Sequence, residues 1–291
     1  MFEHFTQGRM TVSGTEIAYR IAGQGEPLLL LHGHPQTQAI WHKVAPYLTS
    51  QFTVVLADLR GYGDSGKPEP DADHLRYSKR EMAQDQLELM AALGFSQFSV
   101  IAHDRGARVA HRLALDHPQA VKQLVLMDIA PTLSMYRQTN EAFARAYWHW
   151  FFLIRPAPFP ETLITADPAQ YLRSVMGSRS AGMQPFTDEA YADYLRCLQL
   201  DGTARGICED YRASASIDLQ HDEEDLNAGR KISCPLLVLW GEKGTVGQCF
   251  KPLEEWRKVA KNVQGEALPC GHYIAEEQPE LLLEKVLTFL R

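Results

Sequence analysis

The sequence predicts an α/β fold in which helices cover both faces of a doubly wound, mostly parallel sheet. Three observations support this prediction. Short apolar runs alternate with amphipathic helical stretches along most of the 291 residues, which is the order that β–α–β units require. Most of these runs are continuously apolar, as in strands that are buried on both faces. A hairpin pattern precedes them, so the first strands should pair antiparallel.

Seven segments have the composition of strands. The dipeptide Ser13-Gly14 separates the first two like the turn of a hairpin. The central segments are rich in Val, Ile and Leu, and the strand pattern resumes once after a long gap. The predicted strands are residues 9–12, 15–21, 27–32, 52–57, 98–102, 122–127 and 236–240.

Capping signals and apolar spacing predict the helices of the sheet region. The run Ser-Lys-Arg-Glu is a capping box that begins a helix over 78–93, and Gly94 follows its end. A second helix is expected over 106–116, where a His-Pro pair stops it. The chain should end with a helix over 279–290.

The long segment between the last two predicted strands has a different sequence pattern. It has helical patterns at 141–153 and 188–198 but no segment with the composition of a buried strand. We interpret it as an inserted helical cap over the carboxyl edge of the sheet. The predicted organisation is a core formed by residues 1–131 and 216–291, with the cap at 132–215.

Composition excludes several classes of function. Lys and Arg total 29 against 36 Asp and Glu, a formal net charge of −7, and an acidic chain without a basic run binds nucleic acid and anionic membranes poorly. No apolar run approaches the roughly 20 residues of a membrane span, and the first residues lack the pattern of a signal peptide. Five cysteines without a CxxC pair argue against a disulfide framework and a zinc site. We therefore expect a cytoplasmic protein.

Three short motifs follow strand-like segments or lie near the end of the chain. They are His32-Gly33-His34-Pro35, Ala102-His103-Asp104-Arg105-Gly106 and Gly271-His272. Small residues flank the central position of the second motif, which is typical of a nucleophile elbow between a strand and a helix, and that position holds Asp104. A lone Asp at such a turn is more often a helix N-cap. The two accompanying motifs favour catalysis.

Taken together, these motifs resemble the α/β-hydrolase superfamily over nearly the whole chain, and within it the enzymes with an aspartate nucleophile. The closer resemblance is to fluoroacetate (haloacetate) dehalogenases. Each motif is weak alone, but their common order is specific. The motifs are His-Asp-Arg-Gly-x-Arg at 103–108, Asp-Ile-x-Pro-Thr at 128–132, Tyr-Trp-His-Trp at 147–150 and Asp-Tyr-Arg-Ala at 210–213.

The chemistry of the residues agrees with this resemblance. A carboxylate can displace a leaving group from a saturated carbon and form an alkyl ester, so Asp104 is the expected nucleophile. His272 is the expected base that activates water to hydrolyse this ester. Either Asp128 or Glu242 could orient the imidazole, and we expect Asp128, as the resemblance also implies. The backbone N–H groups of His34 and Arg105 would form the oxyanion hole.

Two arginines indicate the class of substrate. Arg105 follows the nucleophile, where relatives that act on neutral substrates usually have Trp, and Arg108 lies about one helical turn further. Two guanidiniums can hold a small carboxylate by charge-assisted hydrogen bonds, each worth about 1.5–3 kcal/mol. The alternative is that Arg105 only keeps Asp104 ionised and that Arg108 pairs with carboxylates of its own helix.

The resemblance also implies a halide site formed by His149, Trp150 and Tyr211 in the cap. Such an aromatic stretch more often only packs a helix against a core, although His and Trp also bring N–H donors. Two features depart from the family. His34 stands where Phe is common, and the segment 174–183 lacks a Trp that relatives carry. These departures concern substrate size and halide preference.

The expected function is hydrolytic dehalogenation of short 2-haloacids, without a cofactor or metal. The expected partners are a small anionic haloacid and water, and the sequence is compatible with a homodimer. One alternative is an epoxide hydrolase with the same Asp104 nucleophile, in which Tyr147 and Tyr211 polarise the epoxide oxygen. The other is a non-enzymatic protein that binds a small acid in the same pocket.

Overall fold

A computed structural model describes all residues, 1–291, and shows the α/β-hydrolase fold around one eight-stranded sheet. The strand order is β1-β2-β4-β3-β5-β6-β7-β8. Strands β1 and β2 pair antiparallel, β2 pairs antiparallel with β4, and all other neighbours are parallel. The strands are β1 Thr6–Val12, β2 Thr15–Ala22, β3 Glu26–Leu31, β4 Phe52–Ala57, β5 Phe98–His103, β6 Val121–Met127, β7 Ile232–Gly241 and β8 Ala260–Leu268.

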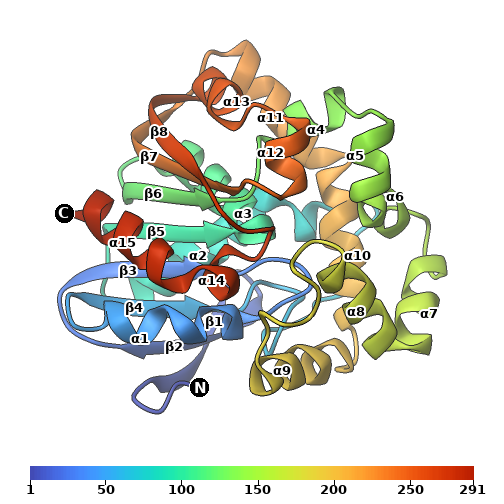
Figure 1. The fold of residues 1–291 in the computed structure, drawn as a ribbon, viewed down its shortest axis with the longest axis horizontal. Helices are drawn as coiled ribbons and strands as arrows, with labels where there is room; N and C mark the ends of the chain where they lie inside the picture. The colour runs from blue at the N-terminus through green and yellow to red at the C-terminus, as the bar shows by residue number, and fades with distance from the viewer.

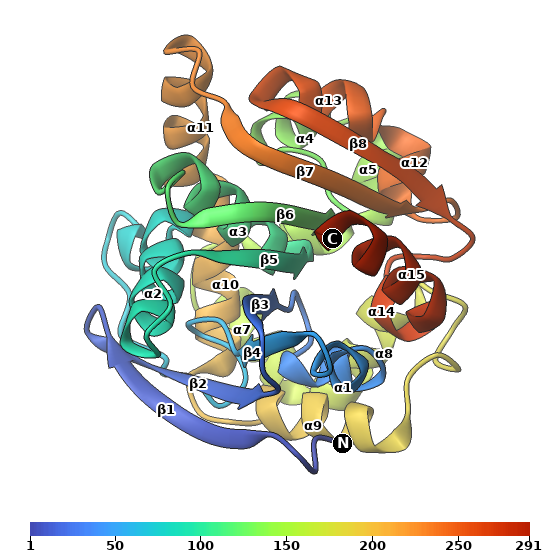
Figure 2. The ribbon, with the colours of Figure 1, turned by 90° about the vertical axis from the view of Figure 1, so that its left-hand side faces the viewer.

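Two layers of helices bury the two faces of this sheet (Figure 2). Alternate side chains of each central strand enter different cores: Leu29 and Leu31 pack with α2 and α3, whereas Leu28 and Leu30 pack with α1 and α15. This two-sided burial explains why the strand sequences are continuously apolar. The helices of the sheet region are α1 Ala45–Leu48, α2 Lys79–Ala92, α3 Asp104–Asp116, α11 Ile217–Asn227, α12 Thr245–Cys249, α13 Pro252–Val259, α14 Ile274–Glu277 and α15 Pro279–Leu290.

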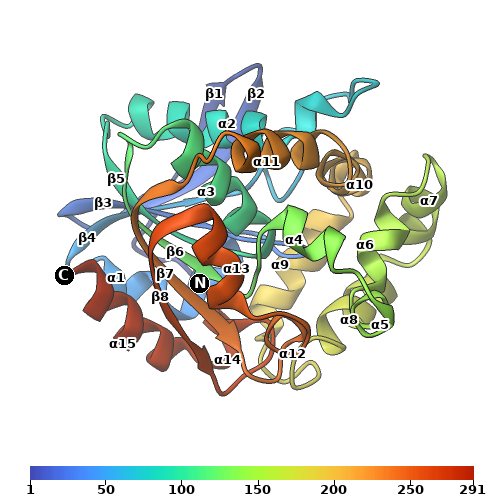
Figure 3. The ribbon, with the colours of Figure 1, turned by 90° about the horizontal axis from the view of Figure 1, so that it is seen from above.

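Between β6 and β7 the chain is helical and contains no strand. Figures 1 and 3 show α5 to α9 grouped on one side of the molecule, away from the bulk of the sheet. The helix expected over 141–153 is divided at Tyr147, whose backbone leaves the helical region. The helices of this segment are α4 Thr132–Arg137, α5 Glu141–Ala146, α6 Trp148–Leu153, α7 Phe159–Ala166, α8 Pro168–Gly177, α9 Asp188–Leu198 and α10 Thr203–Ser214.

The predicted fold class is confirmed, and the seven predicted strands correspond to β1 to β7. The sequence pattern missed β8, which pairs only with β7 at the edge of the sheet. Most of its side chains are exposed or half-buried, so its sequence lacks the apolar run that marked the central strands. No helix combines the length and the apolar composition that a membrane crossing requires.

Candidate active site

Asp104 lies at the sharp turn from β5 into α3. Its φ of +47° is in the left-handed region, which non-glycine residues rarely adopt. The small neighbours allow this turn: a Cβ on Gly106 would lie 2.3 Å from the carbonyl oxygen of His32, and one on Gly33 would lie 2.4 Å from the Cβ of Asp104. His103, not Asp104, is the N-cap of α3. The N-cap alternative for Asp104 is therefore wrong.

The two carboxylate oxygens of Asp104 have different surroundings. Oδ1 accepts a 2.9 Å hydrogen bond from the backbone N–H of His34, whereas Oδ2 is buried without a hydrogen-bond partner and lies 3.6 Å from Nε2 of His272. Burial alone would raise the pKa of Asp104, but the His272 imidazole and the Arg179 guanidinium outweigh it and hold the pKa well below its usual range. Asp104 is therefore an anion with one free oxygen.

His272 lies between this carboxylate and Asp128. Its Nδ1 is 2.5 Å from Oδ2 of Asp128, and the other oxygen of Asp128 accepts a 2.9 Å hydrogen bond from the N–H of Gly241. Asp128 follows β6 and also has a positive φ, of +50°. Glu242 instead donates its backbone N–H to Leu268. Of the two acids considered from sequence, the structure thus places Asp128 beside the imidazole.

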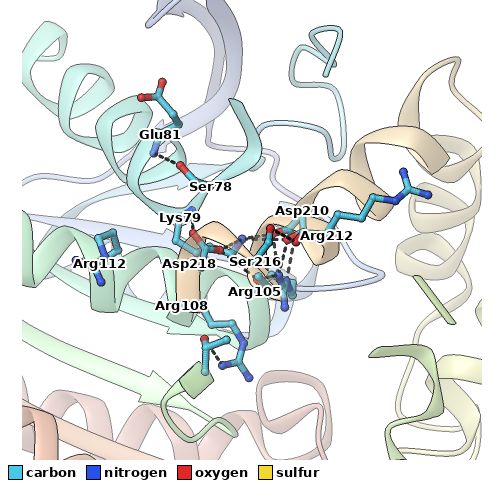
Figure 4. A network of polar contacts seen from close by, with 12 residues as sticks. Ser78, Lys79, Glu81, Arg105, Arg108, Arg112, Asp210, Arg212, Ser216 and Asp218 are labelled. Atoms are coloured by element: carbon cyan, nitrogen blue, oxygen red, sulfur yellow. Dashed lines mark hydrogen bonds and ion pairs between the residues drawn. The ribbon is translucent and has the colours of Figure 1, made fainter. Parts of the chain in front are cut away.

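Arg105 is held by Asp210 of α10 (Figure 4). Its Nε and Nη2 donate to the two oxygens of Asp210, both at 2.8 Å, and Nη2 also donates to Ser214 Oγ at 2.5 Å. Lys79 of α2 and the Tyr62 hydroxyl bind the same carboxylate. Asp104 is not among the ion-pair partners of Arg105. The alternative in which Arg105 only keeps Asp104 ionised is therefore wrong. The arginine that lies beside Asp104 and favours its ionised form is Arg179.

Arg108 has no carboxylate partner. Its Nη1 donates to the carbonyl oxygen of Ala130 at 3.1 Å and to Thr132 Oγ1 at 2.9 Å, and Nη2 lies 3.2 Å from the sulfur of Met135. The expected alternative, pairing with carboxylates of its own helix, is therefore wrong. Nε of Arg108 and Nη1 of Arg105 are buried without a partner. Each guanidinium thus has one nitrogen without a hydrogen-bond partner.

The cap adds an aromatic wall. His149, Trp150 and Tyr211 are buried, and Nε2, Nε1 and the hydroxyl of these residues, respectively, have no hydrogen-bond partner in the protein. The Tyr211 ring packs on Arg105 at 4.0 Å from its guanidinium carbon, and Trp150 packs on Arg108 at 4.7 Å. The structure therefore brings together the donors that the resemblance implied.

His34 completes this wall from the core side. Its ring stacks on His149 at 6.0 Å, and its Nε2 lies 3.0 Å from the Tyr171 hydroxyl. Burial and the charge of Arg179 lower the pKa of His34 to about 3, and the same two causes hold the pKa of His149 well below its usual range. Both imidazoles are therefore neutral. They can donate N–H hydrogen bonds to an anion, and their own charge does not change near neutral pH.

Arg179, in the loop after α8, was not predicted to belong to the site. Its Nη1 lies 3.1 Å from Nε2 of His272 and 4.0 Å from Oδ2 of Asp104. It falls within the segment where the expected Trp was missing. No local pattern distinguishes it from the other arginines of the cap, and only the folded chain brings it to Asp104.

These residues enclose a buried site with an ionised carboxylate, an imidazole beside it and unused cationic and neutral donors around it. Asp104, His272, Arg105 and Arg108 are each no more than 2% exposed. Such a site can form a covalent ester on Asp104 and hydrolyse it. Its donor set is suited to small anions.

Comparison with known proteins identifies the family to which this chain belongs. Residues 26–279 match the family model described as alpha/beta hydrolase fold. A fluoroacetate dehalogenase from Burkholderia sp. is 42% identical over 96% of this chain and 92% of its own length. A soluble epoxide hydrolase from Corynebacterium sp. strain C12 is 35% identical over 99% and 98%. A solved structure of a provisionally assigned α/β hydrolase from Nostoc sp. PCC 7120 has 53% identity, covers 100% of this chain and 99% of its own, and has a TM-score of 0.98.

Proposed function

Because the chain belongs to the α/β-hydrolase family, with a dehalogenase and an epoxide hydrolase among its relatives, we propose that it hydrolyses the carbon–halogen bond of short 2-haloacids such as fluoroacetate or chloroacetate. The observation that carries this proposal is Arg108. A buried guanidinium with no carboxylate partner and one unused N–H is costly unless an anion joins it. The carboxylate of a haloacid supplies that anion, and Arg105 offers a second N–H beside it.

In the first step, Oδ2 of Asp104 attacks the carbon that carries the halogen. A lone pair of Oδ2 forms the new C–O bond, and the carbon–halogen bond breaks with its electron pair leaving on the halide. Oδ2 is the attacking atom because Oδ1 is engaged by the N–H of His34. His149, Trp150 and Tyr211 would donate hydrogen bonds to the departing halide, since their donor atoms have no partner in the protein.

In the second step, water attacks Cγ of the Asp104 ester. His272 takes a proton from this water, and Asp128 stabilises the resulting imidazolium. The negative charge develops on Oδ1, which already faces the N–H of His34. The Cγ–Oδ2 bond then breaks, and the His272 imidazolium gives its proton to Oδ2, which leaves as the hydroxyl of the 2-hydroxy acid. The water oxygen stays on Asp104, whose carboxyl loses its remaining proton to solvent and becomes an anion again. The backbone N–H of Arg105 remains a proposed second donor to Oδ1.

Halide release and isotope labelling test this proposal. Fluoro-, chloro- and bromoacetate are assayed for halide release, which should occur with at least one of them. A single turnover in ¹⁸O-water should then give unlabelled product and label in Asp104. Label in the first-turnover product would mean that water attacks the carbon directly, and the covalent route would be wrong.

An epoxide hydrolase is the second candidate. The free hydroxyl of Tyr211 favours it, because a phenol can donate a hydrogen bond to an epoxide oxygen. The second cap tyrosine is placed differently, since the hydroxyl of Tyr147 lies 3.5 Å from Nδ1 of His272. Turnover of styrene oxide without halide release from any haloacetate would establish this candidate and reject the dehalogenase.

A further inference from the structure

Arg179 contacts Nε2 of His272, the atom that must accept a proton from water in the proposed mechanism. Nδ1 of His272 faces the Asp128 carboxylate and therefore carries the ring proton. Nε2 then holds the single lone pair of the neutral imidazole, and Nη1 of Arg179 lies 3.1 Å from it. A guanidinium only donates hydrogen bonds. While this contact lasts, water cannot give a proton to Nε2.

Other contacts define this position of Arg179. Its Nη2 donates to the carbonyl oxygen of His34 at 2.9 Å and to the Tyr273 hydroxyl at 2.7 Å, and its own carbonyl oxygen accepts the N–H of His272 at 2.8 Å. These partners are neutral. The one ion-pair partner of the guanidinium is the nucleophile itself, with 4.0 Å between Nη1 and Oδ2 of Asp104.

We propose that Arg179 is a positioning residue that covers the lone pair of His272 while Asp104 is an anion, and uncovers it once Asp104 has become an ester. The second half of this statement rests on the proposed function. Ester formation removes the negative charge that faces Arg179 and produces a halide anion in the same site. The guanidinium then loses its ionic partner beside His272, and Nε2 becomes free to accept a proton from water.

The structure provides space for this movement. A cavity of about 430 Å³ lies against the loop that carries Arg179, between the cap and the core. Its wall includes Arg179, Gly271 next to His272, and the acidic residues Glu276 and Glu277. A guanidinium that swings toward this cavity approaches Glu277 and opens a path for water to Nε2. Arg179 therefore lies between this cavity and the nucleophile.

Removal of the guanidinium should expose the lone pair on Nε2 of His272 in the free enzyme. Apart from Arg179, the groups around the imidazole are the Asp104 and Asp128 carboxylates at 3.6 Å and 2.5 Å, the His103 ring at 4.5 Å, the Tyr147 hydroxyl and the Tyr273 ring. Asp128 and the Tyr147 hydroxyl face Nδ1, so Arg179 is the donor at Nε2. In Arg179→Met, Nε2 therefore loses its hydrogen-bond donor, and its nitrogen-15 resonance should move away from the wild-type position.

Nitrogen-15 NMR of the histidine rings measures this directly and needs no substrate. The samples are the wild-type protein, Arg179→Met, Arg179→Lys and, as a matched control, Arg173→Met at an exposed arginine of α8. The lysine variant keeps a donor and a charge, so the Nε2 resonance of His272 should return toward that of the wild type. The control should match the wild type. An unchanged Nε2 resonance in Arg179→Met would overturn the proposal, and Arg179→Gln replaces the methionine variant if that variant does not fold.

Single-turnover kinetics separate this inference from the proposed function. In Arg179→Met, hydrolysis of the ester should persist within about threefold of the wild-type rate or become faster, because in the proposed sequence the guanidinium has already left Nε2 at that stage. Loss of ester hydrolysis in this variant would mean that the guanidinium acts in that step, and it would overturn the proposal. The absence of halide release from the wild type would reject the dehalogenase, and the NMR comparison would still decide whether Arg179 covers Nε2.

Discussion

At the scale of single residues, the two oxygens of the Asp104 carboxylate have different surroundings. The left-handed backbone of Asp104 directs its side chain back over the loop after β3, where the N–H of His34 binds Oδ1. Oδ2 remains free beside His272. A strained backbone conformation costs on the order of 1–3 kcal/mol and persists where surrounding structure holds it. In the proposed mechanism, it would fix which oxygen attacks the substrate and which accepts the developing charge.

Replacement of the imidazole should separate the two proposed chemical steps. In His272→Asn, ester formation should continue because an ionised Asp104 needs no base to attack, whereas ester hydrolysis should stop. Mass spectrometry should show a stable substrate-derived adduct on Asp104 after release of about one equivalent of halide. Full turnover by this variant would remove His272 from the mechanism.

Replacement of Arg108 tests whether the substrate is held by its charge. Arg108→Leu should reduce kcat/KM for haloacetate by roughly 30- to 1000-fold, equivalent to about 2–4 kcal/mol, because one of two charged contacts is lost. The neutral haloacetamide serves as the control substrate, and its kcat/KM should fall much less. Equal losses on both substrates, with an unchanged Tm, would show that Arg108 does not bind the carboxylate.

Residues of this site differ in how far the sequence could predict them. Asp104, Asp128 and His272 lie in short motifs after strands or before helices, and the order of the motifs along the chain is informative. The partner of Arg105 could not be predicted, because Asp210 lies 105 residues away along the chain. Arg179 reaches the base from a loop with no motif. Such contacts depend on how the cap packs on the core, which no local pattern encodes.

At the scale of elements, the Asp210 carboxylate joins α10 of the cap to α2 and α3 of the core. Lys79 and Arg105 bind it from these two core helices, and all three side chains are buried (Figure 4). Burial opposes the ionisation of Asp210, but Arg105 and Lys79 outweigh it and hold its pKa well below the usual range. This ion cluster therefore fixes α10, and with it Tyr211, against α3, the helix that begins at Asp104.

Neutralising this carboxylate should affect both stability and substrate binding. Asp210→Asn leaves the buried Arg105 without its anion and Lys79 with Asp218 alone, so the free energy of unfolding at neutral pH should fall by about 3–5 kcal/mol. Because the pKa of Asp210 is lowered in the fold, the loss relative to the wild type should shrink as the pH falls below the unfolded pKa of an aspartate. The orientation of Arg105 should also be lost, which raises KM for haloacetate.

A matched variant separates these two effects. Asp225 forms a buried ion pair with Arg112, further along α3 and outside the site. Asp225→Asn should also lower the free energy of unfolding in urea titrations, but KM for haloacetate should stay at the wild-type value. If Asp210→Asn also left KM unchanged, Arg105 would not depend on Asp210 for its position.

The elements themselves were largely predictable. Helices α9 and α15 begin and end where the apolar spacing predicted. Ser78 caps α2 as predicted, with Oγ accepting the N–H of Glu81 at 3.2 Å, but the N–H of Ser78 donates to the Leu75 carbonyl and not to Glu81, so only one half of the capping box is formed. Strand β8 was missed because one edge strand needs little apolar sequence. The break at Tyr147 was missed because residues on both sides of it have helical composition. It gives Tyr147 and His149 different directions from those of one continuous helix.

At the scale of the whole molecule, a few polar contacts attach the cap to the core near the site. Glu276 of α14 accepts hydrogen bonds from Gln36, in the loop after β3, at 2.5 Å and from the Tyr194 hydroxyl of α9 at 3.0 Å. Thr37 and Asp193 form a further hydrogen bond between the same two regions, at 2.6 Å. Since the site is closed to solvent, the stability of this attachment bears on how readily a substrate enters.

Glu276 should make the attachment sensitive to pH. Burial raises its pKa to about 8, against 4.5 for an ordinary glutamate, although Tyr194 and Gln36 oppose the rise. A carboxyl group whose pKa is higher in the folded state binds an extra proton there, so its contribution to stability is fully present below the unfolded pKa. The contribution is lost as the pH rises through the folded pKa. The wild type should therefore lose stability between about pH 5 and about pH 9 from this group.

Glu276→Gln removes that titration while keeping a side chain of the same shape. Relative to the wild type, its free energy of unfolding should improve by on the order of 2–5 kcal/mol from about pH 5 to about pH 9, because the wild type must ionise a buried carboxyl over this range. Urea unfolding at several pH values measures the difference, with Glu280→Gln at an exposed position of α15 as the control. The control should follow the wild type throughout. If the curve for Glu276→Gln also ran parallel to that of the wild type, Glu276 would not titrate in this range, and the cap would be attached to the core independently of its charge.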